Sequence, residues 1–315
     1  GYKQKLHVTE DQVSSAYAVD GVQRKMSGDR WGVHVHYDGA DSHLNTLHSE
    51  LECPVCDRTQ EVKKQLVSET LSKTKVVRDM AVSALKKAVF EDTKMPGELA
   101  QQIHISDKAQ LGNCRVTAMA PDAETLQQIQ TMFERGTSTV KQYQVRANPQ
   151  HVVNIKLENK SSNFVAYGVA AETTLALKLA AGVLGNGFAG RLMQQVRDKC
   201  GLTYGIYANA NDQLFYVQAT FAPRLMDRGI AEMKKVMADW KNGVTQQELD
   251  VQKKMMINSR RVAFDDPVKM ADVLHLEHLR GDTYHAEAIN AVTLQEVNDA
   301  IQALGTCTLV KAGTF

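Results

Sequence analysis

Six side chains that could bind a metal ion lie close together in the first part of the chain. They are four histidines and a Cys-x-x-C pair: His34, His36, His43, His48, Cys53 and Cys56. A Cys-x-x-C pair with two histidines can hold Zn²⁺ tetrahedrally, and such a pair can instead be a redox disulfide. A thioredoxin-like redox pair requires a strand–helix context, which is not evident here. The metal candidates are therefore His34, His36, Cys53 and Cys56, although a lone Cys-x-x-C is more often a pair of reduced cysteines.

A further pair of histidines occurs in the segment His275-Leu-Glu-His278. The H-x-x-E-H motif of inverzincins places two histidines four residues apart on a helix, so that both reach one zinc ion. Here the spacing is three, and Leu274 stands where the first histidine would be needed. No H-x-x-E-H occurs anywhere in the chain, so we expect an ordinary helix face and no zinc cofactor in this chain.

The glycines of Gly185-Asn-Gly187-Phe-Ala-Gly190 match G-x-G-x-x-G literally. A dinucleotide site needs a strand before this motif and a helix after it. The preceding residues 173–184 predict a helix, which favours a tight helix–helix connection instead. A catalytic triad assembled from distant residues leaves no sequence signature, but the G-x-S-x-G elbow of serine hydrolases is absent.

The elements that must position these residues alternate between pairs of strands and pairs of helices. Apolar alternation predicts strands at 31–37, 114–120, 152–157, 164–170, 203–208, 214–221 and 308–312. Helical spacing predicts helices at 61–90, 123–133, 173–184, 190–200 and 230–240. Capping boxes at Thr245-Gln-Gln-Glu248 and Thr293-Leu-Gln-Glu296 begin two more. This order predicts an α+β fold, with helices packed on one face of a mostly antiparallel sheet.

A polar segment at 137–150, containing Asn148-Pro149, marks a predicted domain boundary. Residues 1–147 would form a shortened N-terminal α/β half, and residues 148–315 a C-terminal half. A strand followed by a helix occurs in both, at 115–135 and 216–240. The two halves could be related, although generic strand–helix units would give the same impression.

Residues 184–208, LGNGFAGRLMQQVRDKCGLTYGIYA, combine a glycine-rich turn with R-L-x-Q-x-x-R and G-L-T-Y. The segments Gly243-Val-Thr-Gln-Gln-Glu-Leu and Ala291-Val-Thr-Leu-Gln-Glu-Val follow in order. Together these motifs resemble the C-terminal half of the insulinase/pitrilysin family of zinc peptidases, over residues 152–315. The resemblance implies two related halves that face each other across a cavity.

In that family one half carries H-x-x-E-H, and the other supplies an Arg and a Tyr that hold the substrate backbone. The matching positions here are Arg197 and Tyr204, seven residues apart. An Arg fork can hold a peptide carbonyl, and a Tyr hydroxyl can stabilise an oxygen that gains negative charge. Alternatively, Arg197 pairs with Asp198 or a carbonyl, and Tyr204 packs in the sheet.

The N-terminal part departs from the family pattern. The H-x-x-E-H motif is absent, the region before Glu61 is too short for its helix, and Glu69 alone could not hold a catalytic zinc. The resemblance thus implies a substrate-binding subunit whose zinc lies in a separate H-x-x-E-H homologue, as a heterodimer. The alternatives are a purely structural subunit of a larger assembly, such as a mitochondrial respiratory or processing complex, and a His/Cys metal-binding protein.

Composition limits the other partners. Lys plus Arg is 37 and Asp plus Glu is 36, so the net charge of +1 gives no electrostatic reason to expect nucleic acid or an anionic membrane. The longest apolar run, residues 175–184, is too short for a transmembrane helix. Five cysteines do not form a disulfide framework. The compartment is left open, and a mitochondrial matrix or a bacterial periplasm or cytoplasm would suit the resemblance.

Overall fold

The structure, a computed structural model, describes residues 23–29, 32–38, 59–103, 117–120, 122–132, 143–280 and 284–315 of the 315-residue chain. These residues fall into two compact units. Unit one comprises described residues within 1–70, 99–142 and 262–283, and unit two those within 71–98, 143–261 and 284–315. The domain boundary predicted at 147/148 stays a prediction.

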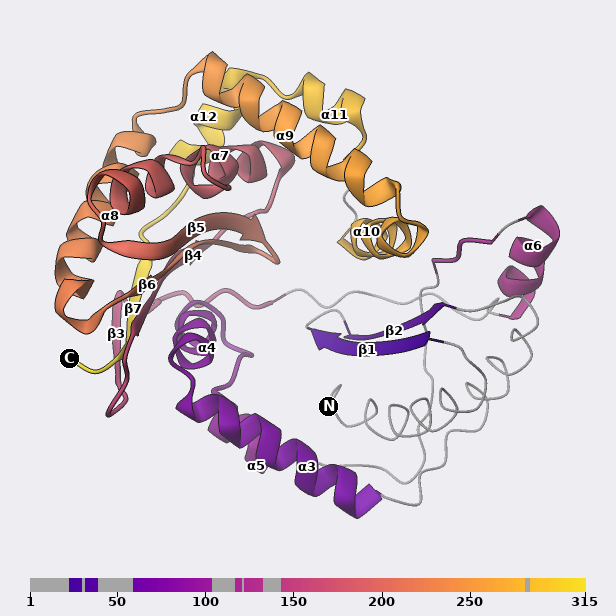
Figure 1. The fold of residues 1–315 in the computed structure, drawn as a ribbon, viewed down its shortest axis with the longest axis horizontal. Coiled ribbons are helices and arrows are strands. Elements are labelled where there is room, and N and C mark those ends of the chain that lie inside the picture. The colour runs from indigo at the N-terminus through magenta and orange to yellow at the C-terminus, as the bar shows by residue number, and fades with distance from the viewer. Residues whose placement is uncertain are drawn as a thin grey trace. The chain divides into compact units, whose positions relative to one another are not determined.

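Unit two is built on a five-stranded sheet in the order β3-β7-β4-β6-β5 (Figure 1). The pairs β7–β4, β4–β6 and β6–β5 are antiparallel, and only β3 pairs with its neighbour in parallel. The strands are β3 (Val152–Lys156), β4 (Asn163–Ala170), β5 (Thr203–Asn211), β6 (Leu214–Phe221) and β7 (Thr308–Gly313). The predicted α+β class with a mostly antiparallel sheet is confirmed.

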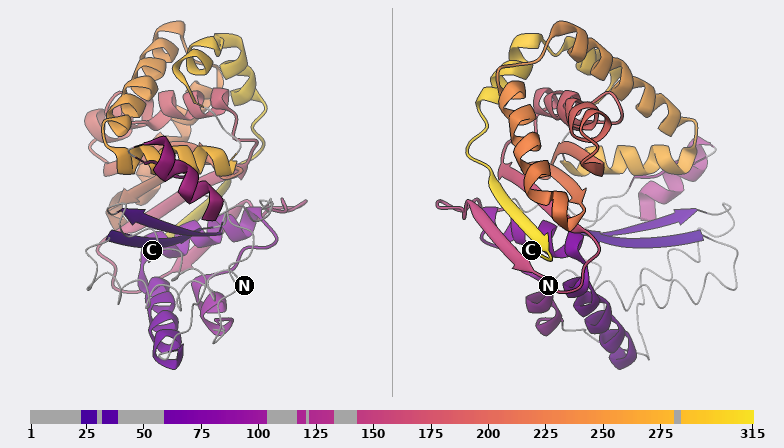
Figure 2. Two further views of the ribbon diagram at one scale, coloured as in Figure 1. Left: turned by 90° about the vertical axis from the view of Figure 1, so that its right-hand side faces the viewer. Right: turned by 60° about the vertical axis from the view of Figure 1, so that its left-hand side comes forward.

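One face of this sheet packs against α7 (Leu175–Gly185), α8 (Met226–Lys241) and α12 (Leu294–Gln302), as Figure 2 shows from two sides. The main core lies in this layer. Phe215 of β6 stacks on Trp240 of α8 with 5.4 Å between ring centroids. The capping boxes predicted before α9 (Gln246–Phe264) and α12 are both formed. The short helix α11 (Ala286–Ala291) precedes α12.

The opposite face of the sheet is covered by α4 (Val77–Val89), which the sequence did not assign to this part of the fold. Small buried residues let the helix approach the strands closely, among them Ala81 and Ala84. The helix predicted at 61–90 is interrupted by a short 3₁₀ turn, η2 (Lys73–Lys75), and an extended residue, Val76. A second core therefore lies beneath the sheet, with Phe90 stacked on Tyr143 at 4.7 Å.

Unit one contains the antiparallel pair β1 (Gln23–Asp29) and β2 (Gly32–Asp38), and the helices α6 (Ala123–Met132) and α10 (Pro267–Arg280). The predicted strand 31–37 and helix 123–133 are confirmed. Residues 117–120, the described part of the strand predicted at 114–120, are not a strand. The chain crosses from one unit to the other within α3 (Thr59–Ser72), within α5 (Pro96–Gln101) and within α9. None of the described helices combines the length and hydropathy needed to cross a membrane.

Candidate functional site

The site begins at the glycine-rich turn that follows α7. A Cβ on Gly185 would collide with the backbone nitrogen of Ala208 in β5, and one on Gly190 would lie 2.8 Å from the Cα of Gly185. The glycines therefore allow close packing of helix, turn and strand. Because a helix precedes the turn, the arrangement is the predicted helix–helix connection and lacks the strand of a dinucleotide site. Phe188, within this turn, is 73% exposed.

Arg197 lies in a π-helix, η3 (Met193–Lys199). The wide turn is visible in the 3.1 Å hydrogen bond that the Cys200 N–H donates to the Gln195 carbonyl, five residues earlier. The helix is held by Leu192 and Val196, which are fully buried, whereas the Arg197 side chain is 34% exposed. Single π turns inside helices are often found at functional sites.

Gly201 ends the helix and turns the chain into β5. Its φ of +63° is a left-handed conformation that glycine adopts at little cost, and its N–H donates to the Arg197 carbonyl at 2.9 Å. Leu202, the next residue, is buried in the main core. Arg197 and Tyr204 therefore lie on two elements joined by a short, fixed turn.

Tyr204 is the extra residue of a β-bulge. Thr203 pairs with Phe221 and Gly205 pairs with Thr220, which leaves Tyr204 without a partner in β6. The Thr203 hydroxyl stabilises the bulge by accepting the Gly205 N–H at 3.1 Å and contacting the Thr220 carbonyl. A bulge can redirect a side chain away from the sheet. The Tyr204 side chain is 96% exposed and is not packed in the sheet.

Among the described residues, the Arg197 side chain has two weak contacts. Its Nη1 lies 3.5 Å from Oδ1 of Asp198, and its guanidinium lies over the Phe188 ring, 5.4 Å from the centroid. An exposed ion pair of this kind contributes up to about 1 kcal/mol, and an exposed cation–π contact about 0.5–1 kcal/mol. A ligand oxygen could therefore replace the aspartate at small cost.

A different arginine, Arg191, links the R-L-x-Q-x-x-R motif to the Gly243-Val-Thr-Gln-Gln-Glu-Leu motif. Its Nε and Nη2 donate to both carboxylate oxygens of Glu248, at 2.7 and 2.8 Å. It also contacts Asp239 and the carbonyl of Gly243, each at 3.2 Å. The bidentate bond from Arg191, followed by backbone and hydroxyl bonds from Thr245, lowers the pKa of Glu248 to about 2. Sequence reasoning missed this pair, although Glu248 is part of the predicted capping box.

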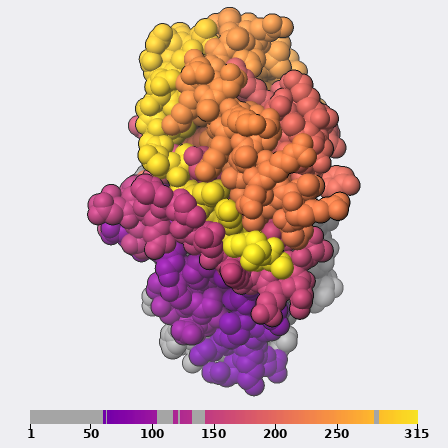
Figure 3. All heavy atoms as spheres, turned by 90° about the vertical axis from the view of Figure 1, so that its left-hand side faces the viewer, coloured from indigo at the N-terminus to yellow at the C-terminus, as the bar shows by residue number. Residues whose placement is uncertain are grey.

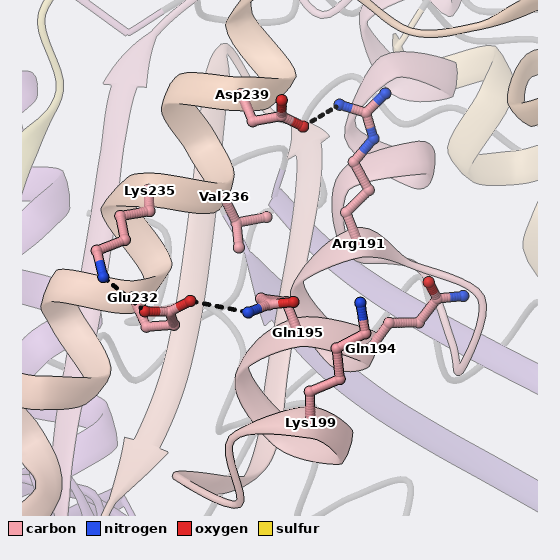
Figure 4. A pocket seen from close by; sticks show the side chains of 8 residues that line it. All are labelled: Arg191, Gln194, Gln195, Lys199, Glu232, Lys235, Val236 and Asp239. Atoms are coloured by element: carbon pink, nitrogen blue, oxygen red, sulfur yellow. Dashed lines mark hydrogen bonds and ion pairs between the residues drawn. The ribbon is translucent and has the colours of Figure 1, made fainter.

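A shallow cavity of about 330 Å³ lies between η3 and α8 (Figure 4). Its charged lining residues bond mainly to one another. Glu232 accepts from Gln195 at 2.9 Å and pairs with Lys235 at 3.1 Å, and Asp239 pairs with Arg191. These contacts link η3 to α8, so the cavity marks a helix–helix junction. Figure 3 shows the face of unit two on which α8 lies, and α8 is part of the orange surface.

The structure describes only some of the predicted metal candidates. His34 and His36 belong to β2, whose backbone alone is described, and Cys53 and Cys56 lie outside the described residues. His275 and His278 lie on α10, where the His275 Nδ1 is 3.1 Å from the Thr117 hydroxyl. Within the described part of the chain, no three His, Cys, Asp or Glu side chains are grouped to hold a metal ion. The His/Cys metal site stays a prediction.

Comparison with known proteins finds similar sequences. A family described as the peptidase M16 inactive domain matches residues 119–256. The non-peptidase homologue YmxG of Helicobacter pylori is 29% identical over 134 residues, which are 38% of this chain and 30% of YmxG. Residues 119–256 are therefore similar to the M16 inactive domain, which agrees with the resemblance of the chain to the insulinase/pitrilysin peptidases. The match to YmxG spans less than a third of that relative.

Solved structures share the fold of this M16 homologue. A peptidase M16 inactive domain from Pseudomonas fluorescens has a TM-score of 0.71 at 17% identity, covering 100% of this chain and 87% of that one. A chain of complex III2 from Candida albicans has a TM-score of 0.70 at 10% identity, covering 98% and 87%. The match to an inactive domain agrees with the missing H-x-x-E-H motif and supports a catalytically silent protein.

Proposed function

We propose that this catalytically silent M16 homologue binds extended peptide segments through Arg197 and Tyr204. The observation that carries the proposal is the β-bulge, which leaves the Tyr204 side chain 96% exposed at the end of the short turn from Arg197. Tyr204 is the second residue of β5, and the bulge there leaves its hydroxyl open to a ligand instead of packed in the sheet. The weak partners of Arg197 support the same conclusion.

The two side chains supply complementary hydrogen bonds to a peptide backbone. The Arg197 guanidinium donates to a peptide carbonyl, and the planar fork keeps two N–H groups in one orientation. The Tyr204 hydroxyl donates to a neighbouring carbonyl or accepts from an amide. The site holds and orients the peptide but contains no group that attacks it. A zinc-bearing H-x-x-E-H homologue would supply that chemistry as a separate partner.

The direct test measures binding of short extended peptides to the full chain by fluorescence anisotropy. Arg197→Ala and Tyr204→Phe should each weaken binding, the first about tenfold or more because it removes a charge-assisted hydrogen bond. Arg228→Ala on the exposed face of α8 is the matched control for loss of one positive charge. Unchanged affinity in both site variants would contradict the proposal.

The partner is tested by native mass spectrometry of the protein purified from its source. A complex with a zinc-bearing homologue supports a split peptidase, and adding that homologue should produce peptide cleavage that Arg197→Ala abolishes. Full cleavage by the Arg197→Ala complex would show that Arg197 has no such role.

A purely structural subunit is the second candidate. It is favoured by the fold shared with a chain of complex III2. This role predicts a large assembly without a zinc-bearing homologue, and an assembly that persists in the Arg197→Ala and Tyr204→Phe variants. Loss of the assembly in those variants would argue against it.

A further inference from the structure

Gln195 joins the two ends of the π turn to each other and to α8. Its carbonyl accepts the Cys200 N–H at 3.1 Å, which makes the turn wider than that of an α-helix. We call this bonding the π register. The side-chain Nε2 of Gln195 contacts the Cys200 Sγ at 3.7 Å and donates to Glu232 of α8 at 2.9 Å (Figure 4). Both hydrogens of one amide are therefore used, one within η3 and one between η3 and α8.

The carboxylate of Glu232 defines how this amide is oriented. Glu232 also pairs with Lys235 at 3.1 Å, and its side chain is 18% exposed. The hydrogen bond from Gln195, followed by that from Lys235, lowers the pKa of Glu232. The carboxylate is therefore ionised at neutral pH and can only accept, so the amide nitrogen of Gln195 must face it. The other charged groups nearby are Arg191, Lys199, Arg228 and Asp239.

The buried residues of this segment do not by themselves select the wide turn. Leu192 and Val196, which reach the core, are four residues apart, and this spacing suits an ordinary α-helix equally well. The contacts from Gln195 to Cys200, five residues later, belong to the π register. A return to α-helical bonding would rotate the later residues of the turn about the helix axis, Arg197 among them.

We propose that Gln195 is a positioning residue of the peptide site, holding η3 in the π register that orients Arg197 toward a bound peptide. This inference rests on the proposed function. Gln195 and Arg197 are two residues apart and lie on different sides of the helix, so the amide acts through the backbone. The direction of Arg197 depends on that backbone, because its side chain has only two weak contacts within the described part of the chain.

The first test is a double-mutant cycle that measures the affinity of the full chain for short extended peptides by fluorescence anisotropy. Gln195→Ala removes both amide contacts and should weaken binding about fivefold. In the Arg197→Ala background the same change should have no further effect, since the guanidinium that Gln195 positions is already gone. An equal loss in both backgrounds would show that Gln195 does not act through Arg197.

A charge variant adds a readout that a merely structural role would not move. Gln195→Glu sets a second carboxylate against Glu232, and the two repel each other at about pH 8. On acidification to about pH 5 the pair takes up a proton and can form a hydrogen bond, so peptide affinity should recover about fivefold. The unchanged chain should show no such recovery. Gln194→Glu, at the exposed neighbouring residue, is the matched control for the added charge and should bind as the unchanged chain does.

The outcomes separate this inference from the proposed function. If peptides bind through Arg197 but the Gln195 variants bind normally, or Gln195→Glu does not recover in acid, the positioning role is wrong and the proposed function stands. If the unchanged chain binds no peptide, both are overturned. Far-ultraviolet circular dichroism shows whether each variant is folded, and if Gln195→Ala is not, the acid recovery of Gln195→Glu decides alone.

Discussion

Arg191 and Arg197 belong to the same R-L-x-Q-x-x-R motif, yet they differ in exposure and in the strength of their contacts. The Arg191 side chain is 19% exposed and makes two charge-assisted bonds to one carboxylate. Arg197 is 34% exposed and has a single aspartate contact at 3.5 Å. The first arginine fastens the motif to α9, and the second lies beside an exposed bulge. Two residues of one motif therefore have different surroundings: Arg191 is held in a structural ion pair, and Arg197, the residue proposed to bind a peptide, has only weak contacts.

The two arginines differ in the surroundings of the carboxylate that each would leave unpaired if it were removed. Removing Arg191 leaves the half-buried Glu248 without its principal partner, and an unpaired carboxylate in such a place is costly. Removing Arg197 leaves Asp198 exposed to water, which solvates it well. Replacing Arg191 should therefore reduce the free energy of unfolding more than replacing Arg197 does. Replacing Arg197 should reduce peptide affinity more than replacing Arg191 does.

The largest effect on stability is expected from Arg191→Ala. We expect a loss of about 2–3 kcal/mol in the free energy of unfolding, because several bonds to Glu248, Asp239 and the Gly243 carbonyl disappear. Arg191→Lys should restore only part, since an ammonium group cannot form the bidentate pair. Urea unfolding measures both, with Arg228→Ala as the control. A loss no larger than that of the control would show that the pair is dispensable.

A smaller loss of stability is expected at acid pH, when Glu248 becomes protonated. The pKa of Glu248 is about 2 in the folded chain and 4.5 in the unfolded reference. Because the folded value is lower, the stabilisation is fully present above pH 4.5 and is lost as the pH falls through about 2. After allowance for solvent screening it amounts to about 1–2 kcal/mol. The pH dependence of urea unfolding should be shallower in Glu248→Gln, and an identical slope would contradict the assignment.

The smallest effect on stability is expected from Arg197→Ala, less than about 0.5 kcal/mol, because both of its contacts are exposed and weak. The same variant should lose most of its peptide affinity, so the two measurements on one protein sharpen the contrast with Arg191. A destabilisation comparable to that of Arg191→Ala would identify Arg197 as a second structural arginine.

The strands and helices of unit two were predictable because each has one apolar face with a clear period. Apolar alternation placed β4 and β6 within a residue of their observed bounds, and capping boxes correctly marked the starts of α9 and α12. The predicted strand at 203–208 was too short, since β5 continues to Asn211 through weak strand formers. Its hairpin turn uses Asp212 and Gln213 with positive φ, a conformation that is uncommon for residues other than glycine.

The details that shape the site were not predictable from pattern. Seven residues are too few for apolar spacing to distinguish a π-helix from an α-helix. The bulge at Tyr204 depends on pairing with the distant β6. Arg197 and Tyr204 entered through family resemblance rather than through physical argument. The exposure of Phe188 and the bond from Arg191 to Glu248 require tertiary structure, because both depend on how the turn and α9 pack.

The position of β7 has a consequence for synthesis of the protein. Residues 308–313 insert between β3 and β4, which otherwise do not pair. During translation, the ribosome releases β3, β4, β5 and β6 well before the strand that joins them. The nascent sheet then has two open edges, which are sites for aggregation or for chaperone binding. Completion of the sheet must wait for the last strand to emerge, however early the surrounding helices form.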